Sequence, residues 1–460
     1  MVYRTARCGL RVTAGQRRRL FGLLRSAGDV WCCVLELNGW RRRRQDPPLA
    51  GYRELARAGP GTFGELDTKG ARSVLRRYCD AWFAAAGRRK AGDKLARFPR
   101  RRRGLLPVRW YAGTFTLAGR VLRLPVARGC APLVVRLDRD PPYPAGQVRS
   151  VTLLCEAGRL HVDVTAEVPV AAYPDGEGPD PGRVAGVDLG IIHPYAAAGP
   201  DGQLLLVSGR AIRAECRQHL REAKARARAA ARRAPRPGQR RSRRWRQHRR
   251  RQQAAEARHR RRVRQAQHEA AKAVTGWAVQ HRVGTLAVGD PRGVLGLDAG
   301  RRHNQRVRAW RIGHLIRALS DKAEAAGITV ALTDERGTSS TCPACARRVP
   351  KPAGRRFRCP HCGHSGHRDL VAAANIAARA GGGTIPALAG AGITHRRAGT
   401  HLPGVHPARR DPRRRPHRGP PQGPLACTGP PRTAPHAERG VARPTARSPE
   451  IHRSIHGQVH

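Results

Sequence analysis

The sequence predicts an α/β domain with a mixed sheet, preceded by a β-rich region with inserted helices and followed by a basic tail. Three observations support this class. Three short apolar runs follow one another between residues 184 and 209, strand and helix patterns then alternate up to residue 380, and periodic apolar residues stop after Gly383. Consecutive strands followed by strands that alternate with helices are typical of a sheet with antiparallel and parallel pairs.

The composition indicates a polyanionic partner. The 460 residues include 90 Lys and Arg against 32 Asp and Glu, which gives a formal net charge of +58. This balance excludes the surface of an ordinary metabolic enzyme. Part of the arginine excess is attributable to GC-rich coding, but the acidic residues are not raised to match. Nucleic acid is therefore the expected partner.

The first 182 residues combine strand and helix patterns. A strand is expected at 3–12, helices at about 20–37 and 64–86, and several alternating strands between 110 and 170. This order predicts a nucleic-acid-binding region that folds as a small β-barrel or twisted sheet, with a helical recognition region inserted after the first strand. The region ends in a linker rich in Pro, Gly and Asp, which marks a domain boundary.

The next domain, residues 183–383, has the element order of an RNase H-like α/β sheet. Its three antiparallel strands turn at Asp201-Gly202, a hairpin signal. The elements expected after them are an Arg-rich helical insertion (211–283), a strand (284–288), an Arg-rich loop, a helix (307–326), a strand (328–333), a cysteine-rich segment (338–366) and a last helix (370–380).

The C-terminal segment, residues 384–460, consists mainly of Pro, Arg, His and Gly. Such a composition buries too little apolar surface to offset the entropy of ordering, so we expect a disordered tail. The N-terminus, Met1–Arg7, lacks the apolar core of a signal peptide, and no run of about 18 apolar residues occurs. A soluble, cytoplasmic protein without a membrane partner is expected.

Four clustered cysteines predict a structural zinc site. They form two Cys-x-x-Cys pairs separated by thirteen residues, Cys342 with Cys345 and Cys359 with Cys362. This spacing places four thiolates tetrahedrally around one Zn²⁺, which leaves no open position for catalysis. Three nearby histidines are expected to face solvent or RNA rather than to replace a cysteine: His361, His364 and His367.

Two aspartates stand out in a chain with few acids. Asp188 ends the first strand of the α/β domain, and Asp369 opens its last helix. In an RNase H-like sheet these positions converge at one edge, where carboxylates hold two Mg²⁺ ions for phosphodiester cleavage. Each Asp alone is equally typical of a turn or a helix cap; their joint spacing around the cysteine segment favours the metal-binding interpretation.

Three motifs together resemble the TnpB family, the OrfB-type transposases of insertion sequences. They are GVDLGIIHPYAAAG, the GTSSTCPAC and FRCPHCG segments, and HRDLVAAANIA, and the resemblance covers about residues 183–380. It implies a transposon-associated, RNA-guided DNA endonuclease with a RuvC-like domain. It also implies two partners, a guide RNA from the transposon end and double-stranded target DNA, in a prokaryotic cytoplasm at the nucleoid.

The resemblance also assigns residues. Asp188 matches the first RuvC acid, Asp369 the third, and Asn375 the Asn of the final helix. The middle acid departs from the pattern, because Gly289 stands where many members carry Glu and Asp290 follows one residue later, on the opposite face of a strand. We prefer Glu335, which closes the next strand, as the middle acid, with Asp290 as the alternative; a nuclease-dead protein remains the third.

Basic residues predict the nucleic-acid contacts. Helices as rich in Arg as those at 211–264 repel themselves unless a polyanion neutralises them, although a solvated face is the simpler alternative. The loop before residue 307 is a second basic segment, suited to phosphate contacts. The residues chosen as contacts are Arg243, Arg244, Arg301, Arg302 and Arg306.

Two rival functions remain. A catalytically inactive RNA-guided DNA-binding repressor is the main alternative, because Gly289 leaves the middle acid in doubt. A zinc-ribbon transcription factor would explain the cysteines but neither Asp188 nor the last helix.

Overall fold

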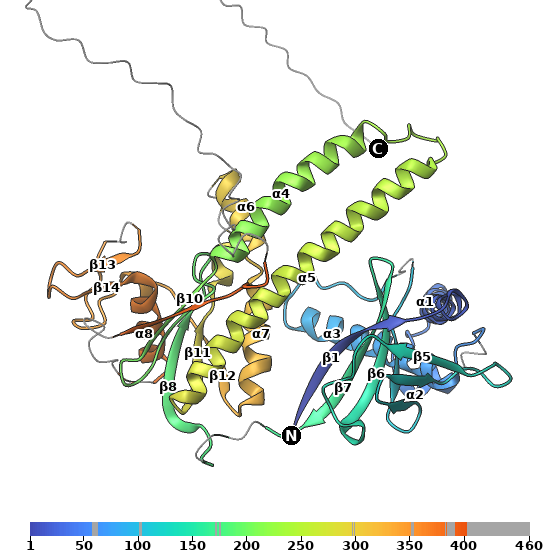
Figure 1. Ribbon diagram of the computed structural model, residues 1–460, viewed down its shortest axis with the longest axis horizontal. Coiled ribbons are helices and arrows are strands. Elements are labelled where there is room, and N and C mark those ends of the chain that lie inside the picture. Colours follow the sequence, from blue (N-terminus) through green and yellow to red (C-terminus); the bar gives the residue numbers. More distant parts are fainter. Residues whose placement is uncertain are drawn as a thin grey trace, which may run out of the picture. The chain divides into compact units, whose positions relative to one another are not determined.

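The computed structural model describes residues 1–57, 63–100, 104–170, 173, 176–296, 298, 300–350, 354–381, 383 and 392–402 (Figure 1). All of them fall in the first of the chain's two units, Met1–Ala408. The second unit, Arg409–His460, lies outside the described residues and holds most of the segment expected to be disordered.

The N-terminal part forms a seven-stranded antiparallel sheet in the order β2-β6-β7-β1-β5-β4-β3. Its strands are β1 (Val2–Arg11), β2 (Val108–Tyr111), β3 (Thr116–Ala118), β4 (Val121–Leu124), β5 (Leu133–Leu137), β6 (Val148–Glu156) and β7 (Arg159–Val168). β1 is central, because it pairs with both β7 and β5. No pairing joins β2 to β3 among the described strands, which fits the twisted-sheet alternative better than a closed barrel.

Three helices follow β1 in the chain: α1 (Ala14–Arg43) and α3 (Thr68–Lys90), which the sequence predicts, and the short α2 (Tyr52–Arg57), which it does not. α1 begins at a capping box in which Thr13 and Gln16 satisfy each other's backbone amides. α3 begins at Asp67, whose carboxylate also accepts a hydrogen bond from the indole of the fully buried Trp110 at 2.8 Å. The cap thus fixes this helix to strand β2.

The second sheet has six strands in the order β12-β11-β8-β9-β10-β15. They are β8 (Asp180–Asp188), β9 (Tyr195–Ala198), β10 (Leu204–Ser208), β11 (Val283–Gly289), β12 (Thr329–Thr333) and β15 (Ile393–Arg397). β8, β9 and β10 are antiparallel, whereas β11, β12 and β15 each run parallel to a neighbour. The three consecutive strands and the later parallel ones agree with the sequence prediction.

The two faces of this sheet carry different helices. Tyr195 and Ala197 of β9 pack with α5 (Arg243–Gln280) and α7 (Ile312–Ala325), whereas Ala196 and Ala198 pack with α8 (Arg368–Arg379) and the cysteine segment. Successive side chains of a strand point to opposite faces, so a run of four buried residues serves two cores.

A long helical pair follows β10. α4 (Arg210–Ala231) and α5 lie side by side over much of their length (Figure 1). The cysteine segment contains the small hairpin of β13 (Arg356–Arg358) and β14 (Ser365–His367), and short 3-10 turns occupy Ala145–Gln147, Pro291–Gly296 and Thr338–Ser340.

The predicted basic loop before residue 307 is a helix. α6 (Arg301–Ala309) starts after Gly300, and Asn304 donates to the carboxylate of Asp298, which also accepts from the Gly300 amide. The segment lacks Gly and Pro, so nothing in it opposes helix formation. The helix predicted at 307–326 is instead divided at Arg311, whose φ of 50° lies in the left-handed region.

The prediction of a disordered tail from residue 384 onwards is wrong for part of that segment. Residues 393–397 form β15, which pairs in parallel with β10 from Leu204↔Ile393 to Ser208↔Arg397. Backbone hydrogen bonds form irrespective of side chains, so a polar strand of this kind carries no alternating apolar signal. The rest of the segment, 384–391 and 403–460, lies outside the described residues.

Candidate functional site

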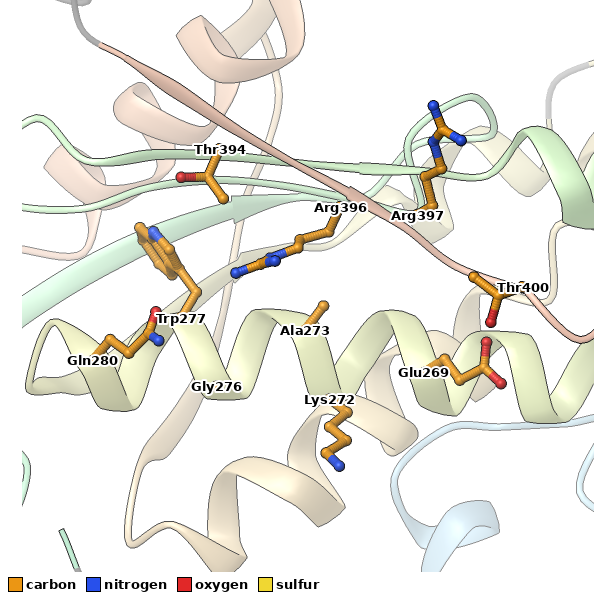
Figure 2. A pocket seen from close by; sticks show the side chains of 10 residues that line it. All are labelled: Glu269, Lys272, Ala273, Gly276, Trp277, Gln280, Thr394, Arg396, Arg397 and Thr400. Carbon is orange, nitrogen blue, oxygen red and sulfur yellow. The ribbon is translucent and has the colours of Figure 1, made fainter. Parts of the chain in front are cut away.

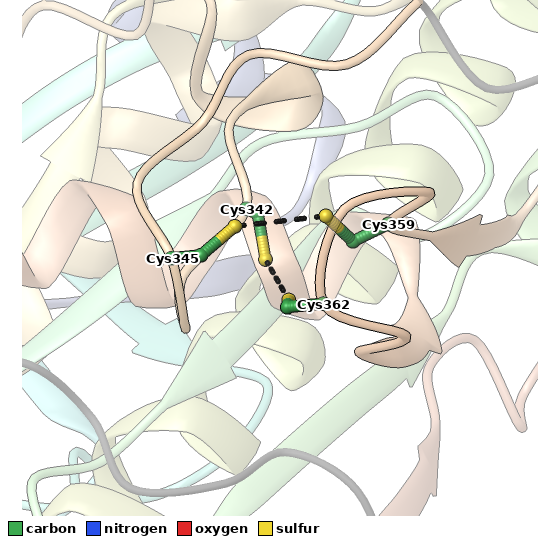
Figure 3. A group of neighbouring side chains, drawn as sticks. All are labelled: Cys342, Cys345, Cys359 and Cys362. Carbon is green, nitrogen blue, oxygen red and sulfur yellow. Dashed lines mark hydrogen bonds between the residues drawn. The ribbon is translucent and has the colours of Figure 1, made fainter.

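The four cysteines converge as the spacing predicts (Figure 3). The sulfur atoms of Cys342 and Cys362 are 3.6 Å apart, and those of Cys345 and Cys359 are 3.7 Å apart. A tetrahedral zinc with bonds of about 2.3 Å places its sulfur ligands roughly 3.8 Å apart. The cluster therefore fits structural zinc, and the fourfold thiolate set leaves no position open for substrate.

Asp188 and the last helix approach each other because β8 and α8 pack very closely. A Cβ on Gly186 would collide with the backbone carbonyl of Ala373 in α8, so only glycine permits this contact. The approach brings Asp369, 4 % exposed at the start of α8, towards Asp188 at the end of β8. The two aspartates predicted from sequence thus lie near each other at the carboxyl end of β8, close enough for the charge of Asp369 to act on Asp188.

The two aspartates have opposite electrostatic environments. Burial, together with the negative charges of Asp369 and Glu335, raises the pKa of Asp188 well above its ordinary value. Burial also acts to raise the pKa of Asp369, but His193 and Arg355 outweigh it and hold that pKa below the ordinary value. Burial and the neighbouring carboxylates thus outweigh Arg368 and Arg355 at Asp188, whereas Asp369 is directly ion-paired with Arg355.

Glu335 belongs to the same acidic group. A Cβ on Gly289 would lie 2.8 Å from Oε2 of Glu335, so this carboxylate fills the space beside the strand position that lacks a side chain. Oε2 of Glu335 is buried without a hydrogen-bond partner among the described residues. Burial and the charges of Asp290 and Asp334 raise the pKa of Glu335 to about 7.

Asp290 faces a different partner. Both of its carboxylate oxygens accept hydrogen bonds from Arg292, with a shortest distance of 2.5 Å. The hydrogen bond from Arg292 holds the pKa of Asp290 below its ordinary value. The structure thus groups Glu335 with Asp188 and Asp369, and it places Asp290 beside them in a solvent-facing ion pair.

The last helix also positions the segment that carries Glu335. The side-chain amide of Asn375 donates to the carbonyls of Thr338 and Thr341, at 2.7 and 2.8 Å. Arg379, one turn later, donates to the carbonyls of Asp334 and Arg336 on either side of Glu335. Asn375 therefore holds the entry of the cysteine segment against α8.

Three residues of the site were not identified from sequence. Nη1 of Arg355 lies 2.5 and 2.7 Å from the two oxygens of Asp369, and Nδ1 of His193 lies 2.9 Å from Oδ2. His367, which was expected to face solvent or RNA, packs edge to face against His193 with ring centroids 5.1 Å apart. Only the adjacency of His367 to Asp369 offered a signal, because His193 and Arg355 lie far away in sequence.

The predicted nucleic-acid contacts are exposed. Arg243 and Arg244 start α5, and Arg301 and Arg306 lie in α6; all four are exposed and make no ion pair with a described residue. Arg302 also lies in α6, but its side chain is outside the description. These arginines are available for phosphate contacts.

A cavity of about 370 Å³ between α5 and β15 is a further basic feature (Figure 2). Its lining includes Lys272, Trp277, Arg396 and Arg397, and Arg396 extends from β15 towards α5. The cavity lies on the α5 face of the sheet, away from the α8 face that carries Asp369.

Two family models match parts of the chain. The family model for probable transposases of the OrfB type matches residues 163–295, and the model for the Cas12f1-like TNB domain matches residues 313–376. Together they cover Asp188, Glu335, Asp369 and the cysteine cluster. The chain matches no curated protein.

One solved structure shows the same fold. The chain resembles the protein of a Cas12f1–sgRNA–target DNA complex with a TM-score of 0.58 and 12% identity, over 79% of this chain and 83% of that one. A looser likeness, with a TM-score of 0.45 and 10% identity, is to the mini-RNA-guided endonuclease CRISPR-Cas-phi3, over 82% of this chain and 92% of that one. At 12% identity the likeness to the Cas12f1 protein establishes the fold alone.

The fold and the cysteine cluster define a class, that of proteins that fold like the Cas12f1 protein and carry a Cas12f1-like TNB domain with four clustered cysteines. Within that class the two family matches are consistent with a TnpB-type protein and agree with the resemblance to OrfB-type transposases. None of the described helices is long and apolar enough to cross a membrane.

Proposed function

We propose that the chain is a transposon-associated, RNA-guided DNA endonuclease that cleaves target DNA by metal-dependent phosphodiester hydrolysis. The observation that most directly supports this proposal is the buried Oε2 of Glu335, which has no hydrogen-bond partner among the described residues. Glu335 belongs to the same cluster of carboxylates as Asp188 and Asp369. An unpaired buried oxygen is costly unless a cation completes it.

The chemistry of the donor set fits Mg²⁺. Carboxylate oxygens are the ligands that this ion prefers, and we assign Asp188, Glu335 and Asp369 to hold it. Two ions bound there would activate water and stabilise the leaving oxygen of the phosphodiester. The chain's own contribution is to fix the carboxylates: the close packing at Gly186 sets the first and third, and Arg379 fixes the loop that carries the second.

We further propose that the six-stranded sheet is an RNase H-like domain spanning residues 183–383, preceded by a nucleic-acid-binding region at 1–182. The helical pair then lies in an insertion, 211–283, and the cysteine cluster in a zinc ribbon, 338–366. The strand order supports this division, because three antiparallel strands are extended by parallel strands on the β8 side. A fully thiolate-bound zinc would stabilise the ribbon and take no part in cleavage.

The proposed partners are a guide RNA encoded at the transposon end and double-stranded target DNA, in the nucleoid of a prokaryotic cell. The unpaired arginines of α5 and α6 support them, since their charge requires an anionic partner. The similar Cas12f1 structure is itself a complex with guide RNA and target DNA. Sequence recognition by base pairing would relieve the protein of reading its target directly.

A second candidate function is a catalytically inactive RNA-guided repressor. Arg355 favours it, because its guanidinium already lies on both oxygens of Asp369. Gly289 also favours it, since the strand position itself carries no acid.

The test is to purify the full chain with its coexpressed transposon end and to sequence the RNA that copurifies. The loaded protein is then given Mg²⁺ and a DNA that matches the guide segment, with a mismatched DNA as control. We expect cleavage of the matched DNA only. Tight binding of the matched DNA without cleavage in Mg²⁺ or Mn²⁺ would establish the repressor instead, and random copurifying RNA would contradict both functions.

A further inference from the structure

His193, His367 and Asp369 form a donor set of a different kind from the acidic group. One ring nitrogen of each histidine and one oxygen of Asp369 all lie within 4.8 Å of one another. Two imidazoles and one carboxylate suit Mn²⁺, Fe²⁺, Co²⁺ and Zn²⁺, whereas Mg²⁺ prefers oxygen ligands throughout. The set therefore differs in metal preference from a group of three carboxylates.

The distance between His193 and Asp369 suits one bound ion. Nδ1 of His193 and Oδ2 of Asp369 are 2.9 Å apart. An ion with bonds of about 2.1 Å places two ligands at right angles roughly 3.0 Å apart, so these atoms can bind it without moving. The rings of His193 and His367 are edge to face, which keeps them separate rather than stacked.

The surroundings hold the donors in place. His193 lies in the loop between β8 and β9, where its carbonyl accepts from the Gly190 amide at 3.0 Å, and His367 ends β14 as the cap of α8. The amide of Asp369 reaches Nδ1 of His367 at 3.3 Å, a long contact that an ion can replace at small cost. Three elements thus contribute one ligand each.

Arg355 does not block this arrangement. It contacts both oxygens of Asp369, but an ion on the His193 side requires only Oδ2 and leaves Oδ1 to the guanidinium. A carboxylate oxygen pair offers about four lone-pair directions, so one group can serve both cations.

We propose that His193, His367 and Asp369 form a 2-His-1-carboxylate site for a divalent transition-metal ion at the Asp369 side of the acidic group. The inference rests on the proposed function and deepens it, because Asp369 belongs both to this site and to the acidic group. One of the metal positions would then prefer Mn²⁺, Fe²⁺, Co²⁺ or Zn²⁺ over Mg²⁺. Water or a phosphate oxygen would complete the coordination, as this donor set leaves positions open.

The test measures metal binding on the full chain with its cysteine cluster loaded with zinc. One equivalent of Mn²⁺ is added in the presence of excess Mg²⁺, and electron spin echo spectroscopy reports whether ¹⁴N of imidazole is bound directly to Mn²⁺. We expect a bound Mn²⁺ with ¹⁴N coupling and an affinity at least about tenfold above that for Mg²⁺.

Variants then locate the nitrogens. His193→Gln and His367→Gln should each lower Mn²⁺ affinity about tenfold or more and leave Mg²⁺ affinity within about twofold, and the double variant should lose the ¹⁴N coupling. His395→Gln, an exposed histidine of β15, is the matched control and should change nothing. Thermal melting of each variant checks that the fold persists.

The inference is wrong if the wild type shows no ¹⁴N coupling, if the coupling survives in the double variant, or if Mn²⁺ and Mg²⁺ bind equally. The wild-type measurement decides even where a variant fails to fold. Cleavage is scored separately: a protein that coordinates Mn²⁺ through nitrogen but cuts no matched DNA contradicts the proposed function only, and a Mg²⁺-dependent nuclease without ¹⁴N coupling contradicts the metal site only.

Discussion

The carboxylate of Glu335 lies beside the Cα of Gly289, where a Cβ would come within 2.8 Å of Oε2. Glu335 follows the neighbouring strand β12 by two residues, so its carboxylate occupies the space beside the strand position that carries no side chain. The two positions compete for one space, because a side chain on Gly289 requires Glu335 to withdraw. This relationship makes the identity of the middle acid directly testable.

The first prediction is that Glu335→Ala abolishes cleavage of guided DNA, whereas Asp290→Ala does not. Replacing Glu335 removes a carboxylate from the acidic group. Replacing Asp290 removes only the ion-pair partner of the exposed Arg292. The double variant Gly289→Glu/Glu335→Ala should regain part of the activity, since the new side chain enters the vacated space beside Ile376. Cleavage rates under single turnover measure this, and an inactive Asp290→Ala with an active Glu335→Ala would reverse the assignment.

The second prediction separates binding from chemistry. Asp188→Asn and Asp369→Asn should reduce cleavage to background, because each removes a negative charge that a divalent ion requires. RNA affinity should stay within about twofold, since neither residue is expected to contact the guide. Asp321→Asn, an exposed residue of α7, is the control and should cut normally. Parallel loss of RNA binding in the two variants would contradict this separation.

The third prediction concerns zinc. The full chain should contain one zinc per molecule by elemental analysis, and Cys359→Ser should lose it, because three thiolates hold the ion far less tightly than four. Limited proteolysis should then cut the variant between residues 338 and 366, where the ribbon unfolds. Cys33→Ser, which changes an exposed thiol outside the cluster, should keep both the metal and the protection. A zinc-free wild type would remove the basis of the prediction.

The fourth prediction concerns salt. Each Arg–phosphate contact releases counterions, so replacing Arg243 and Arg244 by Ala should lower the slope of log affinity against log salt by about 1.4 for single-stranded RNA. Arg120 and Arg149 are already paired with Asp140 and Glu167, and their replacement should leave the slope unchanged. Equal slopes for both double variants would mean that the start of α5 does not touch RNA.

The fifth prediction is a loss of stability in mild acid. Burial lowers the pKa of His314 from 6.5 to about 4, and the positive charges of His268 and Arg264 act in the same direction. Between these values the unfolded chain binds a proton that the folded chain does not, so stability falls as the pH drops below 6.5, by at most about 1.4 kcal/mol per pH unit for this residue.

Urea unfolding at pH 7.5 and pH 5 measures the effect. His314→Gln cannot titrate, so the difference between the two midpoints should shrink, whereas His303→Gln, an exposed change in α6, should leave it unaltered. An unchanged difference in His314→Gln would show that other groups cause the acid sensitivity.

Much of the fold was accessible from sequence because its signals are local. The apolar runs of β8, β9 and β10 and the cysteine spacing each lie within a short segment. Arg311 was not predictable as a helix break, since a non-glycine residue rarely adopts positive φ and no motif announces it. β15 escaped notice because its side chains are mostly polar and exposed.

The candidate site, like the fold, was only partly predictable from local sequence signals. Asp188 and Asp369 stand in recognisable motifs, but the contact of Arg355 with Asp369 joins the cysteine segment to α8 through tertiary packing. The choice between Glu335 and Asp290 depended on which side of a strand each faces, and only the orientation of their side chains separates the two.

The strand β15 also determines where the chain tolerates shortening. It covers the backbone groups of β10 that would otherwise lie bare, from Leu204 to Ser208. Uncovered strands of this kind recruit other chains, so a protein truncated after Gly383 should self-associate and precipitate, whereas one that retains Leu402 should remain monodisperse. Residues 393–397 of the polar C-terminal segment are therefore expected to keep the domain before them from self-associating.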